Sequence, residues 1–323
     1  MSESSRPDMP FDPTADAAVV VRAILRGLFA TLLATLDGVR ANEDPEPLHD
    51  LRVATRRTRS ALAQIRSVFP EPEVADYKTR FAWLQEVTGP VRDLDVYLLG
   101  FEADRQCLPA PLWPHLEPLR VELSHRYEAE RQRLLTALDS DTFARLIEDW
   151  HTFLDIPDTA LQPGQVIPVN AQRPIKTVAD AQIRRLAKRV RREGRAIRAD
   201  SPPEALHALR KHCKKLRYLM EFFQLLYPPR DIRRLIDLLK TLLDQLGHFQ
   251  DLSVQTRYLT ELARHLRETE QVEIETLLAM GALIGHLLER QQSARDAFDE
   301  VFAGYLDPSH QRLLRSLFGR FSP

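Results

Sequence analysis

Apolar residues recur at the spacing of an α-helix along almost the whole chain of 323 residues. In the first such stretch Val20, Ile24 and Leu28 stand four apart, and the series continues through Leu32 and Leu36, as the buried face of a helix requires. No run of β-branched residues alternates at a period of two, which is the pattern of a half-buried strand. The chain is therefore predicted to be all-α.

Prolines and glycines divide this pattern into two groups of helices. Residues 1–13 are polar and contain proline, which predicts a disordered N-terminal tail, and residues 155–177, with several prolines and no periodicity, are expected to form a linker. Two domains are thus predicted, over residues 14–154 and 178–323. The predicted helices cover residues 14–39, 48–69, 71–103 with a break at Gly89-Pro90, 116–138 and 142–154, then 178–197, 204–226, 231–267, 270–304 and a short segment after Pro308.

A basic motif occurs twice, 158 residues apart. The stretch LHDLRVATRRTR at residues 48–59 is matched by LHALRKHCKKLR at residues 206–217. The same offset carries Leu84, Gly89, Asp93, Leu94 and Val96 onto Leu242, Gly247, Asp251, Leu252 and Val254. A gapless match over residues 48–96 predicts that the two domains arose by internal duplication.

Cations line one side of each predicted basic helix. At 100° per residue, Arg52, Arg56 and Arg59 fall within about 80° of His49, beside the apolar face of the helix. The second copy repeats this arrangement around His207, and further cations lie next to the stripe in both copies. The first group of candidate binding residues is His49, Arg52, Arg56, Arg57, Arg59, His207, Arg210, Lys211, Lys214, Lys215 and Arg217.

The helix before the second basic helix carries another cationic row. Its members are spaced 4, 3 and 4 and stay within about 40° of one line, whereas the matching helix of the first half has only two arginines at such positions. These residues form the second group of candidates. They are Arg184, Lys188, Arg191 and Arg195, with Arg22 and Arg26 in the first half.

The alternative to a binding role for these cations is an ordinary solvent-exposed polar helix face, but such faces usually mix Glu and Lys four residues apart. Residues 51–69 contain no acidic residue, and residues 205–224 contain only Glu221. The net charge of the chain is −1, yet residues 173–217 hold 15 Lys and Arg against four acidic residues, a net +11 that leaves −12 for the rest. Such separation creates a local positive field, which predicts a polyanion-binding surface.

The repeated His-x-x-Arg helix, followed by TGPVRDL at residues 88–94 and LGHFQDL at residues 246–252, resembles the CHAD family, the conserved histidine α-helical domain. The resemblance covers nearly the whole chain. It implies two four-helix bundles related by pseudo-twofold symmetry and a basic surface that binds inorganic polyphosphate, with a link to polyphosphate granules. Some members are fused to a triphosphate-tunnel hydrolase domain, whose Glu-x-Glu-x-Lys strand this sequence lacks.

The second motif departs from its first copy, since Gln250 and Ser253 replace Arg92 and Asp95. Its retained aspartates, Asp93 and Asp251, could orient an arginine of the basic helix or serve as structural caps.

An enzymatic function is not predicted. The dipeptide His49-Asp50 is of a kind found in metal phosphohydrolases, but His207 is followed by Ala208, so the two copies share histidine and cations rather than histidine and carboxylate. The sequence contains no His-Glu-x-x-His motif, no Walker-type loop and no spaced Cys/His set. We therefore expect no cofactor, no metal and no catalytic residue.

Single-stranded nucleic acid is the main rival ligand, because it offers the same phosphates. Proteins that bind it usually interleave aromatic side chains for base stacking, and no Phe, Tyr or Trp occurs between Arg173 and Arg217. Nucleic acid is therefore the less favoured partner. A third hypothesis is a helical scaffold whose basic face docks an acidic partner.

The compartment is predicted from what the sequence does not contain. Two cysteines far apart form no disulfide framework, and the N-terminus has no signal-peptide pattern. The longest apolar run, residues 276–288, has 13 residues, too few to cross a bilayer. We expect a cytoplasmic protein without a membrane partner, and no pattern in the chain indicates its oligomeric state.

Overall fold

The structure is a computed structural model that describes residues 11–156, 167–269 and 272–319. Apart from one isolated bridge between Asp16 and Pro174, the regular secondary structure in these ranges is helical, which confirms the all-α prediction. The predicted tail and linker fall in part on residues 1–10 and 157–166, which lie outside the described residues.

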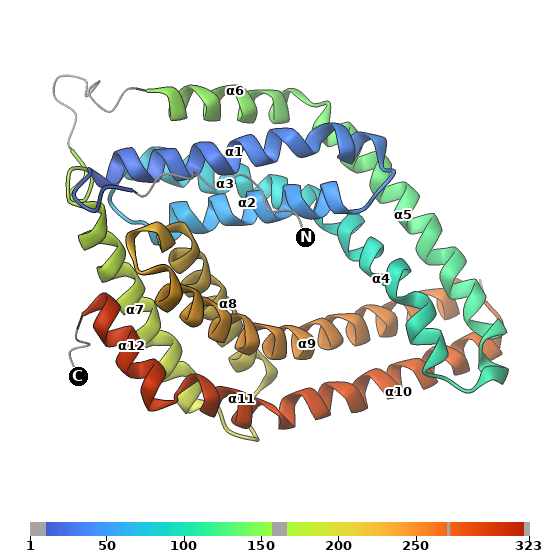
Figure 1. Cartoon of the computed structure of the whole chain (residues 1–323). Helices are drawn as coiled ribbons and strands as arrows, with labels where there is room; N and C mark the ends of the chain where they lie inside the picture. The colour runs from blue at the N-terminus through green and yellow to red at the C-terminus, as the bar shows by residue number, and fades with distance from the viewer. Residues whose placement is uncertain (1–10, 157–166, 270–271, 320–323) are drawn as a thin grey trace.

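The chain forms two successive groups of helices (Figure 1). The first group is α1 (Ala17–Ala41), α2 (Glu46–Gln64), α3 (Glu71–Val87), α4 (Gly89–Gln106), α5 (Glu117–Leu138) and α6 (Asp141–Asp155), with 3-10 turns at Ala110–Leu112 and Pro114–Leu116. The second group is α7 (Ile175–Ala196), α8 (Pro203–Phe222), α9 (Pro229–Glu268), α10 (Ile274–Asp296), α11 (Phe298–Tyr305) and α12 (Pro308–Phe318), with a 3-10 turn at Gln224–Leu226.

Pro90 explains the predicted break between α3 and α4. Proline has no backbone N–H, and its ring clashes with the carbonyl four residues earlier, so a helix rarely continues through it. Accordingly α3 ends at Val87 and α4 begins at Gly89, with Thr88 buried at the junction. His248 stands at the matching position of the second half, and there α9 runs unbroken for 40 residues.

The stretch predicted as one helix over residues 270–304 is two helices, α10 and α11, which meet at Ala297. The short α11 packs on α9, and its Phe302 reaches α7 at Gly194. A Cβ atom on Gly194 would lie 2.0 Å from the ring of Phe302. The missing side chain of Gly194 therefore makes room for the aromatic ring that holds α11 in place.

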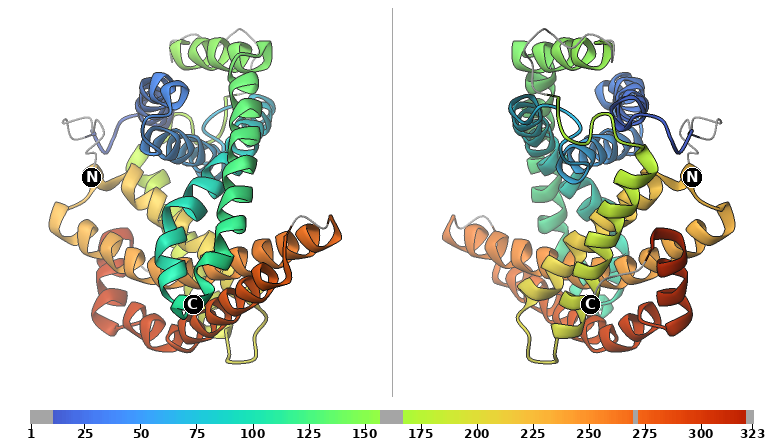
Figure 2. Two further views of the ribbon diagram at one scale, coloured as in Figure 1. Left: turned by 90° about the vertical axis from the view of Figure 1, so that its right-hand side faces the viewer. Right: turned by 90° about the vertical axis from the view of Figure 1, so that its left-hand side faces the viewer.

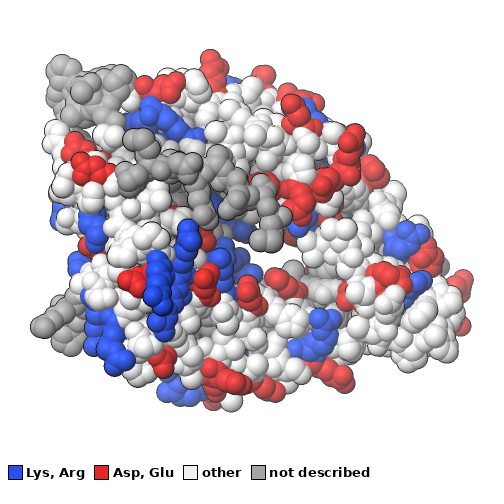
Figure 3. All heavy atoms as spheres, viewed as in Figure 1, with Lys and Arg blue, Asp and Glu red and all other residues white. Residues whose placement is uncertain are grey.

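The two groups of helices contact each other on both sides of the molecule. On one side α2 packs on α8. On the other side Tyr97 of α4 stacks on Tyr258 of α9, with 4.8 Å between ring centroids, and Gln255 donates to Asp104 at 2.6 Å. Figure 2 shows α5 running from the α6 end of the molecule down to α10, on which it packs. Figure 3 shows that the face between the two contacts is hollowed.

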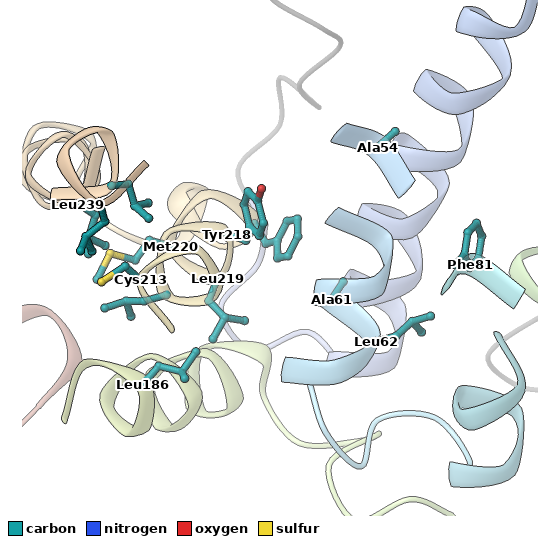
Figure 4. Packing of buried hydrophobic residues seen from close by; sticks show 14 of the residues in the cluster. Ala54, Ala61, Leu62, Phe81, Leu186, Cys213, Tyr218, Leu219, Met220 and Leu239 are labelled. Carbon is teal, nitrogen blue, oxygen red and sulfur yellow. The ribbon is translucent and has the colours of Figure 1, made fainter. Parts of the chain in front are cut away.

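Each group has its own share of the core. Figure 4 shows Cys213 and Met220 of α8 directed toward Leu239 of α9, while Tyr218 of the same helix points toward α2. Cys213 is fully buried, and burial raises the pKa of its thiol. The side chains on opposite faces of α8 thus separate the core of the second group from its contact with the first.

Helix α1 is long and apolar enough to cross a membrane by length and composition, and it is the single helix within the described residues that meets this test. A search for uninterrupted apolar runs in the sequence does not find this helix, because Arg22 and Arg26 interrupt its apolar residues. The core helix of a soluble protein passes the same test, and Leu25, Phe29 and Leu32 are buried in the protein core.

The two groups are also joined where each begins. The backbone N–H groups of Ala17 and Ala18 donate to the carbonyls of Arg173 and Ala171, and the N–H of Ile175 donates to the carbonyl of Ala15. The first turn of α1 is therefore fastened to the segment that leads into α7.

Candidate anion-binding site

Six cations from three helices gather where α2 packs on α8, and we call them the central cluster. Arg56 and Arg217 lie over the ring of Tyr218, 6.0 and 5.3 Å from its centroid. Figure 3 shows Lys and Arg on the side of the hollow where α2 and α8 lie. Burial lowers the pKa values of Arg52, Arg210 and Lys214, and the positive charges of other members add to that shift. The central cluster consists of Arg52, Arg56, Arg92, Arg210, Lys214 and Arg217.

Arg52 is held by the end of α3. Its Nη1 donates to the carbonyl of Gln85 at 2.9 Å and to Oγ1 of Thr88 at 3.0 Å. Such acceptors exist because the last carbonyls of a helix have no partner within the helix. Burial raises the pKa of the nearby Asp93, and the positive charge of Arg52 opposes that shift. Arg52 therefore closes the junction that Pro90 creates.

Arg210, the counterpart of Arg52, has fewer partners. Its Nη2 lies 3.9 Å from Oδ1 of Asp251, and its side chain is 18% exposed against 77% for the aspartate. Its buried Nε has no hydrogen-bond partner among the described residues. Helix α9 is unbroken where it passes Arg210. It therefore has no helix-end carbonyls there that could accept from Arg210, as the end of α3 does for Arg52.

A glycine makes room for each of these arginines. A Cβ atom on Gly89 would lie 3.5 Å from Nη1 of Arg52, and one on Gly247 would lie 3.2 Å from Nη2 of Arg210. Asp251 lies in the middle of α9 and cannot cap that helix. The hypothesis that the motif aspartate orients the motif arginine therefore fits the second copy better than a capping role.

Lys214 is the most perturbed cation of the central cluster. Burial lowers its pKa to about 7, helped by the positive charges of Arg210, Arg56 and Arg217 and opposed by Asp251. Among the described residues, no carboxylate oxygen lies within 4.0 Å of its ammonium group. A charge held this way is stabilised by any anion that enters the cluster.

Other donors of the central cluster also lack acceptors. Nε of Arg56, Nε of Arg210 and Nη1 of Arg92 are buried without a hydrogen-bond partner in the part of the chain that the structure describes. An unpaired buried donor costs about 1–3 kcal/mol, more for a charged group. Phosphate oxygens match the forked donors of guanidinium groups, so this arrangement suits a phosphate-rich ligand.

The two motif histidines have different neighbours. Burial lowers the pKa of His49, with contributions from Arg92 and Arg56 against Glu46 and Asp50. Nδ1 of His207 instead lies 2.8 Å from Oε1 of Gln250, the residue that takes the place of Arg92. Within the described ranges, no three His, Cys, Asp or Glu side chains are grouped so that they could hold a metal ion.

Glu221 closes the central cluster at the end of α8. One of its carboxylate oxygens lies 3.6 Å from Nη2 of Arg57, and the other lies 3.3 Å from Nε of Arg217. The guanidinium group of Arg57 also lies over the ring of Phe222, 5.4 Å from its centroid. Arg57 therefore stabilises the contact between α2 and α8, while Arg59 is half-buried on α2.

A second set of cations, the lateral cluster, lies on the α7 side of α8. Glu193 joins the two helices here, with 2.7 Å to Nε of Arg189 and 2.7 Å to Nδ1 of His212. Burial and the positive charges of the four other members lower the pKa of Lys215. Of its members, Lys211 and Lys215 belong to the first group of candidates predicted from the sequence, and the three arginines were not predicted as candidates. The members are Arg66, Arg185, Arg189, Lys211 and Lys215.

The predicted row on α7 faces the other edge of that helix. Nη1 of Arg184 donates to the carbonyl of Phe318 at the end of α12, at 2.7 Å, and the charge of Arg191 acts on Tyr305 of α11. Lys188 and Arg195 are exposed. Helical angles show that the four residues of the row lie along one line of α7. The packing of α8 and α12 on α7 decides which edge of α7 lies next to the cations of α8.

Arg22, one of the predicted ligand-binding residues, is buried and contacts the protein itself. Arg22 is 7% exposed, its guanidinium group donates to the carbonyl of Phe153, and it lies 5.2 and 5.4 Å from the ring centroids of Phe69 and Phe153. Arg26 donates to the next carbonyl, that of Leu154. Both arginines bind the end of α6, which covers this part of α1.

Comparisons with known proteins show the family of the chain. A sequence model of the CHAD domain matches residues 23–260. The uncharacterized protein Rv2226 of Mycobacterium tuberculosis is 30% identical over 224 residues, which cover 68% of this chain. That match covers 42% of Rv2226, so the chain spans less than half the length of this curated relative.

Two solved structures are similar in fold. The CHAD domain from the plant Ricinus communis gives a TM-score of 0.69 at 23% identity, with 97% of this chain and 95% of that chain covered. PptA from Streptomyces chartreusis gives a TM-score of 0.65 at 18% identity, with 90% and 100% covered. At these identities the similarity shows a shared fold.

Proposed function

The chain belongs to the CHAD domain family, and from this premise we propose that it binds inorganic polyphosphate at the central cluster and catalyses no reaction there. One observation carries the proposal: cations from both halves converge on one site, and several of their buried N–H groups have no acceptor in the described protein. Oxygens of a phosphate chain would supply these acceptors at every residue of the polymer. The negative charge of the polyphosphate would thereby offset the mutual repulsion of the cations.

The aromatic side chains at the site favour a ligand without bases. Tyr218 is 3% exposed and Phe222 is 5% exposed, and guanidinium groups already lie over both rings. A nucleic-acid base needs an open aromatic face on which to stack. Single-stranded nucleic acid therefore remains the second candidate, supported by phosphate charge alone, and an acidic protein partner is the third.

The 158-residue offset supports a further part of the proposal, that the two halves derive from one duplicated four-helix unit. Arg52 and Arg210, separated by this offset, each pack over a glycine separated by the same offset. We also propose a cytoplasmic role at polyphosphate granules, which the two free cysteines fit.

The decisive experiment is a competition at physiological salt among long-chain polyphosphate, single-stranded DNA and RNA. We expect polyphosphate to bind most tightly. With about eight phosphates neutralised, the logarithm of its affinity should fall with the logarithm of salt concentration at a slope of roughly −5 to −6. A preference for either nucleic acid would overturn the proposal.

A charge-reversed variant locates the site. Changing Arg52, Arg56, Arg210 and Lys214 to Glu should abolish polyphosphate binding while the helical circular dichroism is retained. The matched control changes four exposed arginines outside the cluster to Glu, with the same change in net charge. These are Arg145, Arg264, Arg312 and Arg315. Equal loss of affinity in both variants would show that net charge, and not this site, determines binding.

A further inference from the structure

Lys214 is surrounded by cations on its own helix and on the facing one. Arg210 precedes it by one helical turn and Arg217 follows it by three residues, while Arg56 reaches toward it from α2. The negative charge of Asp251 opposes the lowering of the Lys214 pKa. The carboxylate of Asp251 lies 3.9 Å from the guanidinium group of Arg210. The amine of Lys214 thus sits in a half-buried site whose charge is nearly all positive.

Partial burial among cations favours the neutral form of Lys214, which is the nucleophilic form of a lysine. With a pKa of about 7, a large fraction of the side chain is the neutral amine at the pH of the cytoplasm, whereas an ordinary lysine is almost fully protonated. Only the neutral amine has a lone pair that can attack a carbonyl carbon. The neighbouring arginines remain charged throughout this pH range.

The arginines around Lys214 can hold a phosphoryl group beside that amine. Nε of Arg56 and Nε of Arg210 are buried and have no hydrogen-bond partner in the described protein. A small ligand with a phosphate at one end would place that end on the guanidinium groups, and its other end would lie close to Lys214. Fixing two reactants in this way raises the rate of their reaction.

We propose that Lys214 is acylated by acyl phosphates, the mixed anhydrides of a carboxylic acid and phosphoric acid. The neutral amine attacks the carbonyl carbon, a C–N bond forms, and the bond from the carbonyl carbon to the phosphate oxygen breaks. Inorganic phosphate leaves with the electron pair, and the nitrogen loses its proton to water. The product is an uncharged amide, and the step needs no oxidant, reductant or further reactant.

The modification would regulate the site, and this consequence rests on the proposed function. Acylation removes one positive charge from the middle of the central cluster and adds an apolar group between Arg56 and Arg210. Polyphosphate should bind the acylated protein less tightly. A bound polyphosphate chain should in turn cover Lys214 and keep acyl phosphates away from the amine.

The chain offers internal controls, because it contains seven lysines. Lys240 is 51% exposed and pairs with Asp237 at 3.2 Å, as ordinary surface lysines do. Lys215 lies in the lateral cluster, where burial and the neighbouring cations also lower its pKa. Modification of Lys214 can therefore be compared with two lysines in the same sample.

The test treats the full chain with acetyl phosphate and follows each lysine by peptide mass spectrometry. We expect Lys214 to react at least about tenfold faster than Lys240 near pH 7.5, since far more of it is neutral. Its rate should level off above pH 8, while that of Lys240 keeps rising. A Lys214 rate equal to or below that of Lys240 would overturn the proposal.

A second donor separates phosphate recognition from simple reactivity. N-hydroxysuccinimidyl acetate carries no phosphoryl group, so its preference for Lys214 over Lys240 should be several-fold smaller than that of acetyl phosphate. Arg56→Gln should reduce the preference shown by acetyl phosphate toward that of the ester, and circular dichroism checks that this variant folds. Equal preference with both donors would contradict a site for acyl phosphates.

Protection by polyphosphate distinguishes the two proposals. If polyphosphate slows acetylation of Lys214 and leaves that of Lys240 unchanged, both are supported. If Lys214 is acetylated selectively but polyphosphate neither binds nor protects, the proposed function fails and the acylation site stands. If polyphosphate binds and Lys214 is not selectively acetylated, the acylation site fails alone.

Discussion

The two copies of the basic motif place an arginine over a glycine in the same way but use it differently. In the first half Arg52 donates to two acceptors at the end of α3. In the second half Arg210 has one carboxylate at 3.9 Å and a buried Nε without a hydrogen bond. The motif is shared, but the first arginine mainly makes hydrogen bonds within the protein, whereas the second has an unpaired donor that could bind a ligand.

Two substitutions account for this difference. Pro90 ends α3 and leaves helix-end carbonyls for Arg52, whereas His248 lets α9 pass through the same level without a break. Thr88, whose hydroxyl also accepts a hydrogen bond from Arg52, is replaced by Leu246, which is buried and has no hydroxyl. The comparison teaches that a backbone break decides whether a motif cation is structural or available.

The largest effect should come from introducing that break into the second half. His248→Pro removes a backbone N–H and creates a clash within α9, which costs about 3 kcal/mol or more in a helix interior. We expect the free energy of unfolding, measured with urea, to fall by that amount. His248→Ala is the control, because the side chain of His248 is exposed, and a similar loss in that variant would contradict the explanation.

Exchange of the two arginines for glutamine should separate their roles. Arg210→Gln removes a charged donor of the proposed binding site. A hydrogen bond to a charged group is worth about 1.5–3 kcal/mol, so the Kd for polyphosphate should rise roughly tenfold to a hundredfold. Arg52→Gln should lower the melting temperature more and the affinity less. If the two variants lose equal affinity and equal stability, the comparison between the halves is wrong.

A smaller effect is expected at the two glycines. In Gly247→Ala the new Cβ atom would lie 3.2 Å from Arg210, so the guanidinium group must shift, and the affinity should fall a few-fold. In Gly89→Ala the contact with Arg52 would be an ordinary 3.5 Å, so we expect little change. Isothermal titration calorimetry on both variants measures this contrast, and a greater loss in Gly89→Ala would contradict it.

The smallest effect is a pH dependence from His49. Its pKa lies below the ordinary 6.5 in the free protein, and a bound polyanion raises it, so binding takes up a proton and affinity rises as the pH falls through that range. Each unit by which the bound pKa exceeds the free one contributes at most about tenfold. A flat profile in the parent protein would contradict this expectation.

The contribution of His49 is isolated in a Lys214→Arg background, because Lys214 also titrates near neutral pH. There His49→Gln should flatten the remaining slope more than His207→Gln does. In the absence of ligand, the contribution of His49 to folding stability depends on pH in the opposite direction. The unfolded chain protonates this histidine first, so stability is present above pH 6.5 and decreases as the pH falls below it.

Much of the fold and part of the site could be predicted from the sequence. Helical periodicity and prolines give the all-α class and the break at Gly89-Pro90, and helical angles put Arg52 and Arg56 on one side of α2. They contain no information on which helices touch. The convergence of α2 and α8 and the covering of Arg22 by α6 therefore needed the structure.

The lateral cluster shows the same limit. Arg185 and Arg189 flank the predicted row on α7 by about 100–140° around the helix axis, and the sequence favours neither edge. The packing of α8 on one edge and α12 on the other selects the flanking arginines. A signal that was available for Arg22 is its position between Val21 and Leu25, on a face that is otherwise apolar.

The backbone hydrogen bonds between the start of α1 and residues 171–175 have a consequence for protein engineering. They bring the beginning of the second half next to the beginning of the first, and they do not depend on an intact chain between α6 and α7. Two separately produced fragments, cut between residues 156 and 167, would carry complementary edges at this place as well as at α2 and α8. The protein is thus suited to split-fragment complementation, with reassembly restoring the central cluster that neither fragment contains alone.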